Sequence, residues 1–342
     1  MTNNNSISAT IEWQSPSNLA IVKYWGKKNT QEPLNSSISF TLKKAVTITK
    51  VTATPAARGS FSFMLDGKPH GAFNEKISLF LEKAKQQLPF LHNHHVHINS
   101  HNTFPHSSGI ASSASSMSAL ALCLIDLQAM SQGRPPGQPD LKTVSNLARL
   151  GSGSACRSVY AGWTLWGKHP NVPNSSDQYA IELENIHPNF QSLADAILIT
   201  DPGSKKISSS AGHALMKNHP FGKARIEQAN SNTLKLLDIL SSGDYAGFFA
   251  IAEHEALTLH ALMMSSNPGY TLLQPNSLLI IEEIRKARTQ KNIPVGFSMD
   301  AGPNVHLLYP KNETNIIVPW IEETIRPLCY NQTILFDEMK RP

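Results

Sequence analysis

Polar and apolar residues alternate between positions 36 and 55, and Val, Ile, Thr and Phe dominate this stretch. Alternation of this kind predicts a β-strand with one buried face. A mixed pattern over residues 8–26 predicts another strand that leads into a turn. The dipeptide Asp66-Gly67 predicts a hairpin, and residues 94–104 predict a strand that runs into a serine-rich loop.

Helical spacing of apolar residues is clearest over residues 75–88, where Ile77, Phe80, Leu81 and Ala84 fall on one face. The pattern after the serine-rich loop is apolar on nearly every side, which predicts a buried helix. Both helices would cover the strands described above.

Asp140 and Gly151 mark the ends of the next predicted helix, as an N-cap and a C-terminal glycine. After a loop rich in Pro, Asn and Ser, a new apolar strand begins, followed by several helices and a strand pair within 295–310. A last helix is predicted over residues 318–328. We therefore expect an α+β protein of two domains, residues 1–190 and 191–342.

The composition narrows the class of protein. The chain has 342 residues, of which 40% are hydrophobic and 16% charged, and we see no apolar run long enough to predict a membrane span. Three widely spaced cysteines and a polar N-terminus without a signal-peptide pattern favour a cytoplasmic protein. The net charge of +5 permits a nucleic-acid partner, but the basic residues form no stripe and suit a small polyanion equally well.

The serine-rich stretch, FPHSSGIASSASSMSALAL at 104–122, is the first candidate site. Small side chains at the start of a helix let backbone N–H groups approach a phosphate, and the helix dipole favours its negative charge. No lysine follows the glycine where a P-loop requires one. The alternative is a small-residue helix that packs tightly against a sheet.

A second stretch, GSGSACRS at 151–158, has the composition of an anion-binding nest. Arg157 adds a guanidinium that can hold a carboxylate or a phosphate through two hydrogen bonds. Cys156 lies inside the stretch without an evident histidine partner, so we interpret it as a packing residue.

Asp300 closes an apolar strand and precedes Ala-Gly-Pro, so its carboxylate could act as a general base or orient a hydroxyl. The alternative is an Asx-turn that uses the carboxylate locally. Asn18, Lys23 and Lys27 lie on or just after the first strand. The two lysines could reach one anion, or could be edge-strand charges.

Four segments together resemble the mevalonate diphosphate decarboxylases of the GHMP kinase superfamily: SPSNLAIVKYWGKKN with PLNSSISFTL, FPHSSGIASSAS, GSGSACRS and MDAGPN. Their order and spacing match over nearly the whole chain. The resemblance implies a two-domain GHMP kinase-like fold with the active site between the domains. It also implies ATP and Mg²⁺ as cofactors, a homodimer, and conversion of mevalonate 5-diphosphate to isopentenyl diphosphate, ADP, phosphate and carbon dioxide.

The resemblance further assigns roles to individual residues. Asp300 would orient or deprotonate the 3-hydroxyl, Lys23 would lower the pKa of Asp300 and stabilise phosphate charge, and Arg157 would hold the substrate. The residues expected to bind the substrate diphosphate are Tyr24, Lys27, Ser152, Gly153, Ser154, Ser208 and Ser209. Those expected to bind the ATP phosphates are Ser107, Ser108, Gly109, Ser112 and Ser113.

The sequence departs from the family pattern in three places. His106, Ser107 and Ser108 stand where a threonine and two small apolar residues are usual, the loop between Lys28 and Asn35 is short, and His213 replaces a common methionine. These departures bear on nucleotide affinity and on the preference for a diphosphate or a monophosphate. The rival interpretations are therefore a monophosphate decarboxylase, a kinase that only phosphorylates the 3-hydroxyl, and a basic nucleic-acid-binding protein.

The histidines of residues 92–101 invite a metal hypothesis, but no carboxylate or cysteine accompanies them, so an exposed strand face is the preferred interpretation. The segment from His254 to His260 has histidines six positions apart, unlike a zinc-protease helix, and predicts an ordinary helix.

Overall fold

The computed structural model describes residues 6–28, 31–104, 110–203 and 209–341. The first half of the chain forms a seven-stranded sheet in the order β4-β3-β5-β2-β6-β7, with β1 also paired to β2. All neighbouring strands are antiparallel except β3 and β5. The strands are β1 (Ala9–Ala20), β2 (Ser37–Pro55), β3 (Ser60–Leu65), β4 (Lys68–Pro69), β5 (His94–Asn102), β6 (Trp163–Trp166) and β7 (Ala180–Glu182).

Three helices pack on this sheet: α1 (Asn74–Ala84), α2 (Ser112–Ser131) and α3 (Leu141–Gly151). Helix α2 lies against β1 and β2 and is buried along most of its length, as its sequence predicts. Within the part of the chain that the structure describes, α2 is the one helix long and apolar enough to cross a membrane, yet 78% of that window is buried inside the protein. It is therefore accounted for as a core helix.

Local sequence signals explain several boundaries. The Asp140 side chain accepts a hydrogen bond from Thr143 N at 3.0 Å and caps α3, which ends at Gly151 as predicted. Asp66 and Gly67 both have positive φ, at 51° and 73°, and join β3 to β4 in the predicted hairpin.

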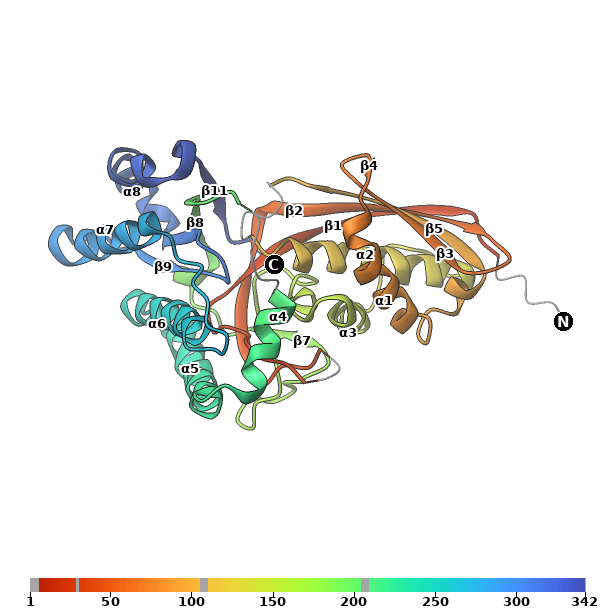
Figure 1. Cartoon of the computed structure of the whole chain (residues 1–342), viewed down its shortest axis with the longest axis horizontal. Coiled ribbons are helices and arrows are strands. Elements are labelled where there is room, and N and C mark those ends of the chain that lie inside the picture. The colour runs from red at the N-terminus through yellow and green to blue at the C-terminus, as the bar shows by residue number, and fades with distance from the viewer. Residues whose placement is uncertain (1–5, 29–30, 105–109, 204–208, 342) are drawn as a thin grey trace.

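The second half of the chain forms a four-stranded antiparallel sheet in the order β11-β8-β10-β9, with helices packed around it. Figure 1 shows helices α5 to α8 gathered around this sheet at one end of the molecule, with the long N-terminal sheet extending to the other. The strands are β8 (Leu193–Leu198), β9 (Gly296–Ser298), β10 (Val305–Pro310) and β11 (Ile334–Glu338). The helices are α4 (Ser209–Ala214), α5 (Gly222–Ser242), α6 (Tyr245–Met264), α7 (Pro275–Lys291) and α8 (Thr314–Trp320).

The last helix begins four residues before the predicted 318–328 segment, and it continues beyond Trp320 as a π-helical turn, Ile321–Ile325, and a 3₁₀ turn, Arg326–Leu328. Pro319 lies inside α8, where a proline removes one backbone hydrogen bond. The strand β11 was not predicted.

One hydrophobic core joins the two halves. Phe40 and Trp163 of the first sheet share it with Phe248 of α6 and Leu308 of β10. The rings of Trp163 and Phe248 meet edge to face, with centroids 6.0 Å apart. The two sheets are therefore packed together rather than linked only by the chain.

The end of the chain reinforces this contact. Asp337 of β11 accepts hydrogen bonds from the backbone N–H groups of Lys43, Lys44 and Ala45 in β2, at 3.1, 2.8 and 2.7 Å. Buried backbone donors need partners, so this carboxylate fixes the C-terminal strand to the N-terminal sheet.

Candidate active site

Lys23 and Asp300 are 277 positions apart in the sequence and meet between the two halves. Lys23 follows β1 with its side chain 2% exposed, whereas the Asp300 side chain, after β9, is 25% exposed. Lys23 Nζ lies 3.0 Å from Asp300 Oδ1 and also donates to the Ala20 carbonyl oxygen. Burial lowers the pKa of Lys23, and the charge of Asp300 acts in the opposite direction. A buried cation thus faces a carboxylate that a ligand can reach.

The turn after Asp300 holds its backbone. The Asp300 carbonyl oxygen accepts hydrogen bonds from Gly302 N at 2.7 Å and from His260 Nε2 at 3.2 Å. The carboxylate itself reaches across to Lys23, a contact for which the Asx-turn alternative does not account. The geometry is compatible with a group that accepts or orients a proton of a ligand hydroxyl.

Arg157 lies at the end of the 3₁₀ turn Gly153–Arg157 and is 2% exposed. Its Nε and Nη2 both donate to Asn18 Oδ1 at 3.2 Å, and its Nη1 donates to Ser37 Oγ at 2.9 Å. Burial lowers the pKa of Arg157, while the charges of neighbouring groups, Asp300 among them, favour its charged form. The guanidinium is therefore oriented by β1 and β2 and lies within electrostatic reach of Asp300.

Gly153 is required by close packing. A Cβ at this position would lie 2.8 Å from the Trp166 ring and 2.9 Å from the Tyr24 hydroxyl oxygen. Tyr24 is in turn packed edge-on against Trp166, with centroids 4.7 Å apart. The structure thus brings the Tyr24 hydroxyl beside the backbone of the predicted nest.

The two serine-rich stretches also meet. Ser113, in the first turn of α2, has its Oγ 3.2 Å from Oγ of Ser152, at the start of the nest. The main chain of Ser112 accepts hydrogen bonds from the hydroxyls of Ser115 and Ser116. The beginning of α2, whose first N–H groups lack intrahelical acceptors, therefore lies next to the nest.

Positive charge gathers where helix α1 meets the loop after β1. Lys27 is half-buried, and burial together with the charge of Lys83 lowers its pKa. Burial and the charge of Lys27 lower the pKa of Lys76 to about 8. The Lys27 ammonium donates to Gln31 Oε1, a neutral acceptor, at 2.8 Å. Lys76 and Lys83 both lie on α1, so this helix and the loop after β1 hold like charges together, an arrangement that favours an anionic ligand.

Models of two protein domains match the chain. The diphosphomevalonate decarboxylase-like N-terminal domain matches residues 15–180, and the mevalonate 5-diphosphate decarboxylase C-terminal domain matches residues 196–340. A diphosphomevalonate decarboxylase from Ganoderma lucidum is 30% identical over 90% of this chain and 80% of its own length. The chain belongs to the diphosphomevalonate decarboxylase family.

A solved structure within the family contains MVAPP, AMPPCP and magnesium; it is 28% identical, covers 98% of each chain and has a TM-score of 0.83. A phosphomevalonate decarboxylase from Haloferax volcanii is 27% identical over 89% of this chain and 88% of its own length. The predicted family and the predicted two-domain α+β fold are confirmed.

His213 packs against two aromatic rings, with its ring centroid 4.3 Å from that of Tyr24 and 4.6 Å from that of Trp25. Its Nδ1 accepts a hydrogen bond from Gly26 N at 2.9 Å, and burial lowers its pKa to about 3. The neutral imidazole therefore fixes α4 to the segment that carries Tyr24 and Lys27.

Several of the residues that we predicted to bind phosphate lie outside the part of the chain that the structure describes, or have contacts only within the protein. Ser107, Ser108, Gly109 and Ser208, together with His106, lie outside the described residues. Ser209 is the first residue of α4, but the position of its side chain is not described. Ser154 lies in the nest, where its carbonyl oxygen accepts a hydrogen bond from Asn18 Nδ2 at 3.2 Å. The ligand-binding roles of all these residues stay predictions.

Two features were missed from the sequence. Asn18 was noted beside Lys23 and Lys27, but its contact with Arg157 was missed, because an asparagine in a strand carries no signal of its partner. Lys76 and Lys83 were not singled out, because lysines on an amphipathic helix usually extend into solvent. Only the packing of α1 shows that they lie near Lys27.

The histidine-rich strand has ordinary partners. His95 and His97 hydrogen-bond to serines of β3, and His101 pairs with Asp66. Among residues 6–28, 31–104, 110–203 and 209–341, no group of three or more His, Cys, Asp or Glu side chains could hold a metal ion. The segment from His254 to His260 lies within helix α6, as predicted.

Proposed function

We propose that this protein converts mevalonate 5-diphosphate and ATP to isopentenyl diphosphate, ADP, phosphate and carbon dioxide. The observation that carries the proposal is the Lys23–Asp300 pair at 3.0 Å, placed between the two halves of a chain of this family. The reachable carboxylate of Asp300 suits removal of a proton from a tertiary hydroxyl. The buried ammonium of Lys23 suits stabilisation of the negative charge that develops beside it.

The oxygen of the 3-hydroxyl attacks the γ-phosphorus of ATP, and ADP leaves. Asp300 accepts the proton that this hydroxyl loses. Lys23 stabilises the charge on Asp300 and on the transferred phosphoryl group. The C3–O bond then breaks with release of phosphate. The electrons of the bond from C2 to the carboxylate form the C2–C3 double bond, and carbon dioxide leaves.

Arg157 holds the substrate carboxylate or its phosphates. Asn18 and Ser37 accept hydrogen bonds from its guanidinium and so fix the orientation in which it meets the substrate. The groups assigned to the substrate diphosphate are Tyr24, Lys27, Ser152, Gly153, Ser154, Ser208 and Ser209. An oriented guanidinium beside several hydroxyls and backbone N–H groups favours anions with several oxygens.

ATP supplies the phosphoryl group, and magnesium offsets the charge of its phosphates. The hydroxyls of Ser113 and Ser152 beside the start of α2 fit a polyphosphate. Lys27, Lys76 and Lys83 add positive charge where α1 meets the loop after β1. Magnesium in nucleotide sites is held mainly by phosphates and one or two protein oxygens, so a carboxylate cluster is not required. We assign Ser107, Ser108, Gly109, Ser112 and Ser113 to the ATP phosphates.

The second candidate is a decarboxylase that takes mevalonate 5-phosphate. It is favoured by the similarity to the Haloferax volcanii enzyme and by the unusual His213 next to Tyr24. We retain it as the nearest alternative, because both reactions need the same Asp300, Lys23 and Arg157.

Product analysis with ATP and magnesium, offering mevalonate, its 5-phosphate and its 5-diphosphate separately, tests the proposal. Carbon dioxide from the diphosphate alone supports it. Carbon dioxide from the monophosphate assigns the alternative. ADP without carbon dioxide leaves a kinase and contradicts the roles given to Asp300 and Lys23.

We further propose two domains that divide near residue 190, a cytoplasmic location and a homodimer. The boundary is supported by the change of sheet between β7 and β8. The location is supported by Cys123, Cys156 and Cys329, which are free and buried. Sedimentation analysis of the purified protein tests the homodimer.

A further inference from the structure

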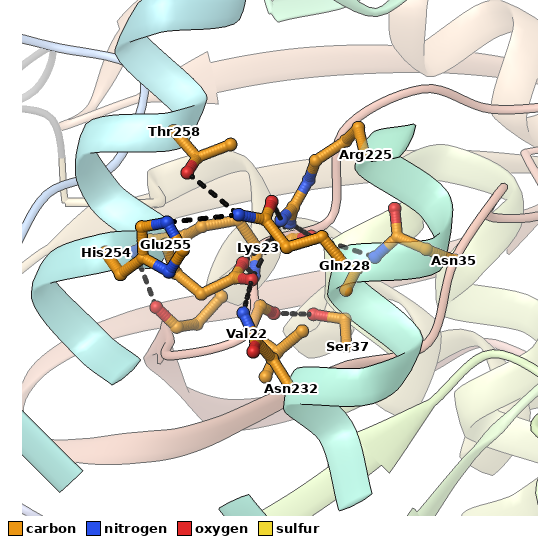
Figure 2. A network of polar contacts seen from close by, with 12 residues as sticks. Val22, Lys23, Asn35, Ser37, Arg225, Gln228, Asn232, His254, Glu255 and Thr258 are labelled. Atoms are coloured by element: carbon orange, nitrogen blue, oxygen red, sulfur yellow. Dashed lines mark hydrogen bonds and ion pairs between the residues drawn. The ribbon is translucent and has the colours of Figure 1, made fainter. Parts of the chain in front are cut away.

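A buried ion pair from two C-terminal helices surrounds the backbone of Lys23. Arg225 of α5 and Glu255 of α6 are 1% and 0% exposed, and their side chains meet through two contacts, Nη1–Oε1 at 2.8 Å and Nη2–Oε2 at 2.6 Å. Figure 2 shows both side chains converging on Lys23 within a larger polar network. Such a pair is expensive to desolvate, so its position invites a functional explanation.

Both members of the pair bind the same residue. Lys23 N donates to Glu255 Oε2 at 2.8 Å, and Arg225 Nη2 donates to the Lys23 carbonyl oxygen at 3.0 Å. Asn35 Nδ2 adds a second donor to that carbonyl, also at 3.0 Å, and Asn232 Nδ2 donates to Glu255 Oε1 at 2.7 Å. The strand pairing of β1 ends at Ala20, so the backbone of Lys23 obtains these bonds from side chains instead.

We propose that Glu255 and Arg225 are positioning residues, which hold the backbone of Lys23 so that its ammonium lies against Asp300. The inference rests on the proposed function only in that Lys23 must act on the reacting groups. Glu255 and Arg225 lie on α6 and α5. The C-terminal half of the chain therefore sets the position of a side chain that belongs to the N-terminal half.

Electrostatics adds a second effect of the same pair. The charged groups around Lys23 are Asp300, Glu255, Arg157 and Arg225, and the first three shift its pKa. Burial lowers the pKa of Lys23, the two carboxylates raise it and Arg157 lowers it. Removing the charge of Glu255 therefore lowers the pKa of Lys23 further, and the ammonium is lost at a lower pH.

The chain offers a matched control on the same helix. Glu253 of α6 forms a two-contact ion pair with Arg288 of α7, and the contacts described for that pair do not include Lys23. Glu253→Gln removes the same charge from the same helix two positions away. It should leave kcat within about twofold of wild type, as expected for a change outside the site.

The test measures kcat, KM and the pH profile of kcat for wild type, Glu255→Gln and Glu253→Gln, each corrected for the folded fraction. For Glu255→Gln we expect kcat to fall by about 10- to 100-fold, because small displacements of catalytic groups have effects of this size. The fall of kcat on the alkaline side should begin at a lower pH than in wild type. Equal kcat values and pH profiles in the two variants would overturn the proposal.

Arg225→Lys keeps the test decisive if Glu255→Gln does not fold. A lysine preserves the positive charge, but it cannot bridge Glu255 and the Lys23 carbonyl as a planar fork does. For Arg225→Lys we expect a lower kcat, a KM close to that of wild type and an unshifted alkaline side of the pH profile of kcat. A kcat equal to that of wild type would refute the positioning role of the pair. Absence of carbon dioxide release by the wild-type protein would refute the proposed function instead, so the two failures are distinguishable.

Discussion

Two acid–base pairs in this protein differ in whether a ligand can reach them. Lys23 and Asp300 join the two halves and leave the carboxylate 25% exposed. Asp195 and His306 connect β8 to β10 at 2.7 Å, with side chains 0% and 3% exposed. Burial raises the pKa of Asp195, and the charge of His306 opposes this shift. A charged pair can act on a ligand only if one member remains reachable, so we assign reactivity to the first pair and sheet stabilisation to the second.

The largest expected effect tests the reachable carboxylate. Asp300→Asn should lower kcat by about 10³-fold, the scale of losing a general base, and leave the Kd for ATP nearly unchanged. Carbon dioxide release and equilibrium ATP binding measure the two quantities. Turnover like that of wild type would remove Asp300 from the mechanism.

Arg157→Ala should have the next largest effect. Loss of a charged hydrogen-bonding group contributes about 1.5–3 kcal/mol, which corresponds to roughly a 10- to 150-fold fall in kcat/KM for the mevalonate substrate. Steady-state kinetics at saturating ATP checks this. Unchanged kcat and KM would place the anion-binding group elsewhere.

Lys76→Met should raise the KM for ATP about fivefold at neutral pH, since one phosphate-attracting charge is lost. The pKa of Lys76 is lowered to about 8. The wild-type ammonium therefore becomes neutral as the pH rises through that value, and the wild-type KM for ATP should rise. The variant should lack this rise; identical pH dependence in both proteins would show that Lys76 does not contact the nucleotide.

The smallest catalytic effect is expected at the enclosed pair. Asp195→Asn should leave kcat of the folded enzyme within about twofold of wild type and lower the free energy of unfolding by about 1–3 kcal/mol, because a buried hydrogen bond to His306 is weakened. Urea unfolding and kinetics on the same preparation measure both. A large loss of kcat without loss of stability would break the distinction between the two pairs.

Local patterns in the sequence predicted most of the fold. Alternation indicated β2, Asp66-Gly67 indicated the hairpin, and Asp140 with Gly151 bounded α3. The strand β11 was missed because its stability comes from pairing with β8, a partner far away in the sequence. The start of α8 was predicted four residues too late, because helix boundaries are the part of an element that a sequence pattern defines least.

The candidate site was predictable wherever a motif carried its chemistry. Lys23 and Asp300 were singled out, and the structure brings them together. What surrounds them was not predictable: Glu255 and Arg225 lie on helices whose sequence gives no reason to place them beside Lys23. Long-range contacts of this kind depend on how the two halves pack, and single-sequence patterns do not contain that information.

The core shared by Trp163, Phe248 and Leu308 has a consequence for how the protein unfolds. Separating the halves would expose this apolar surface to water, at a free-energy cost that grows with its area. We expect a single calorimetric transition for the whole chain, and fragments cut near residue 190 to be insoluble apart and to recover their fold only when they are combined.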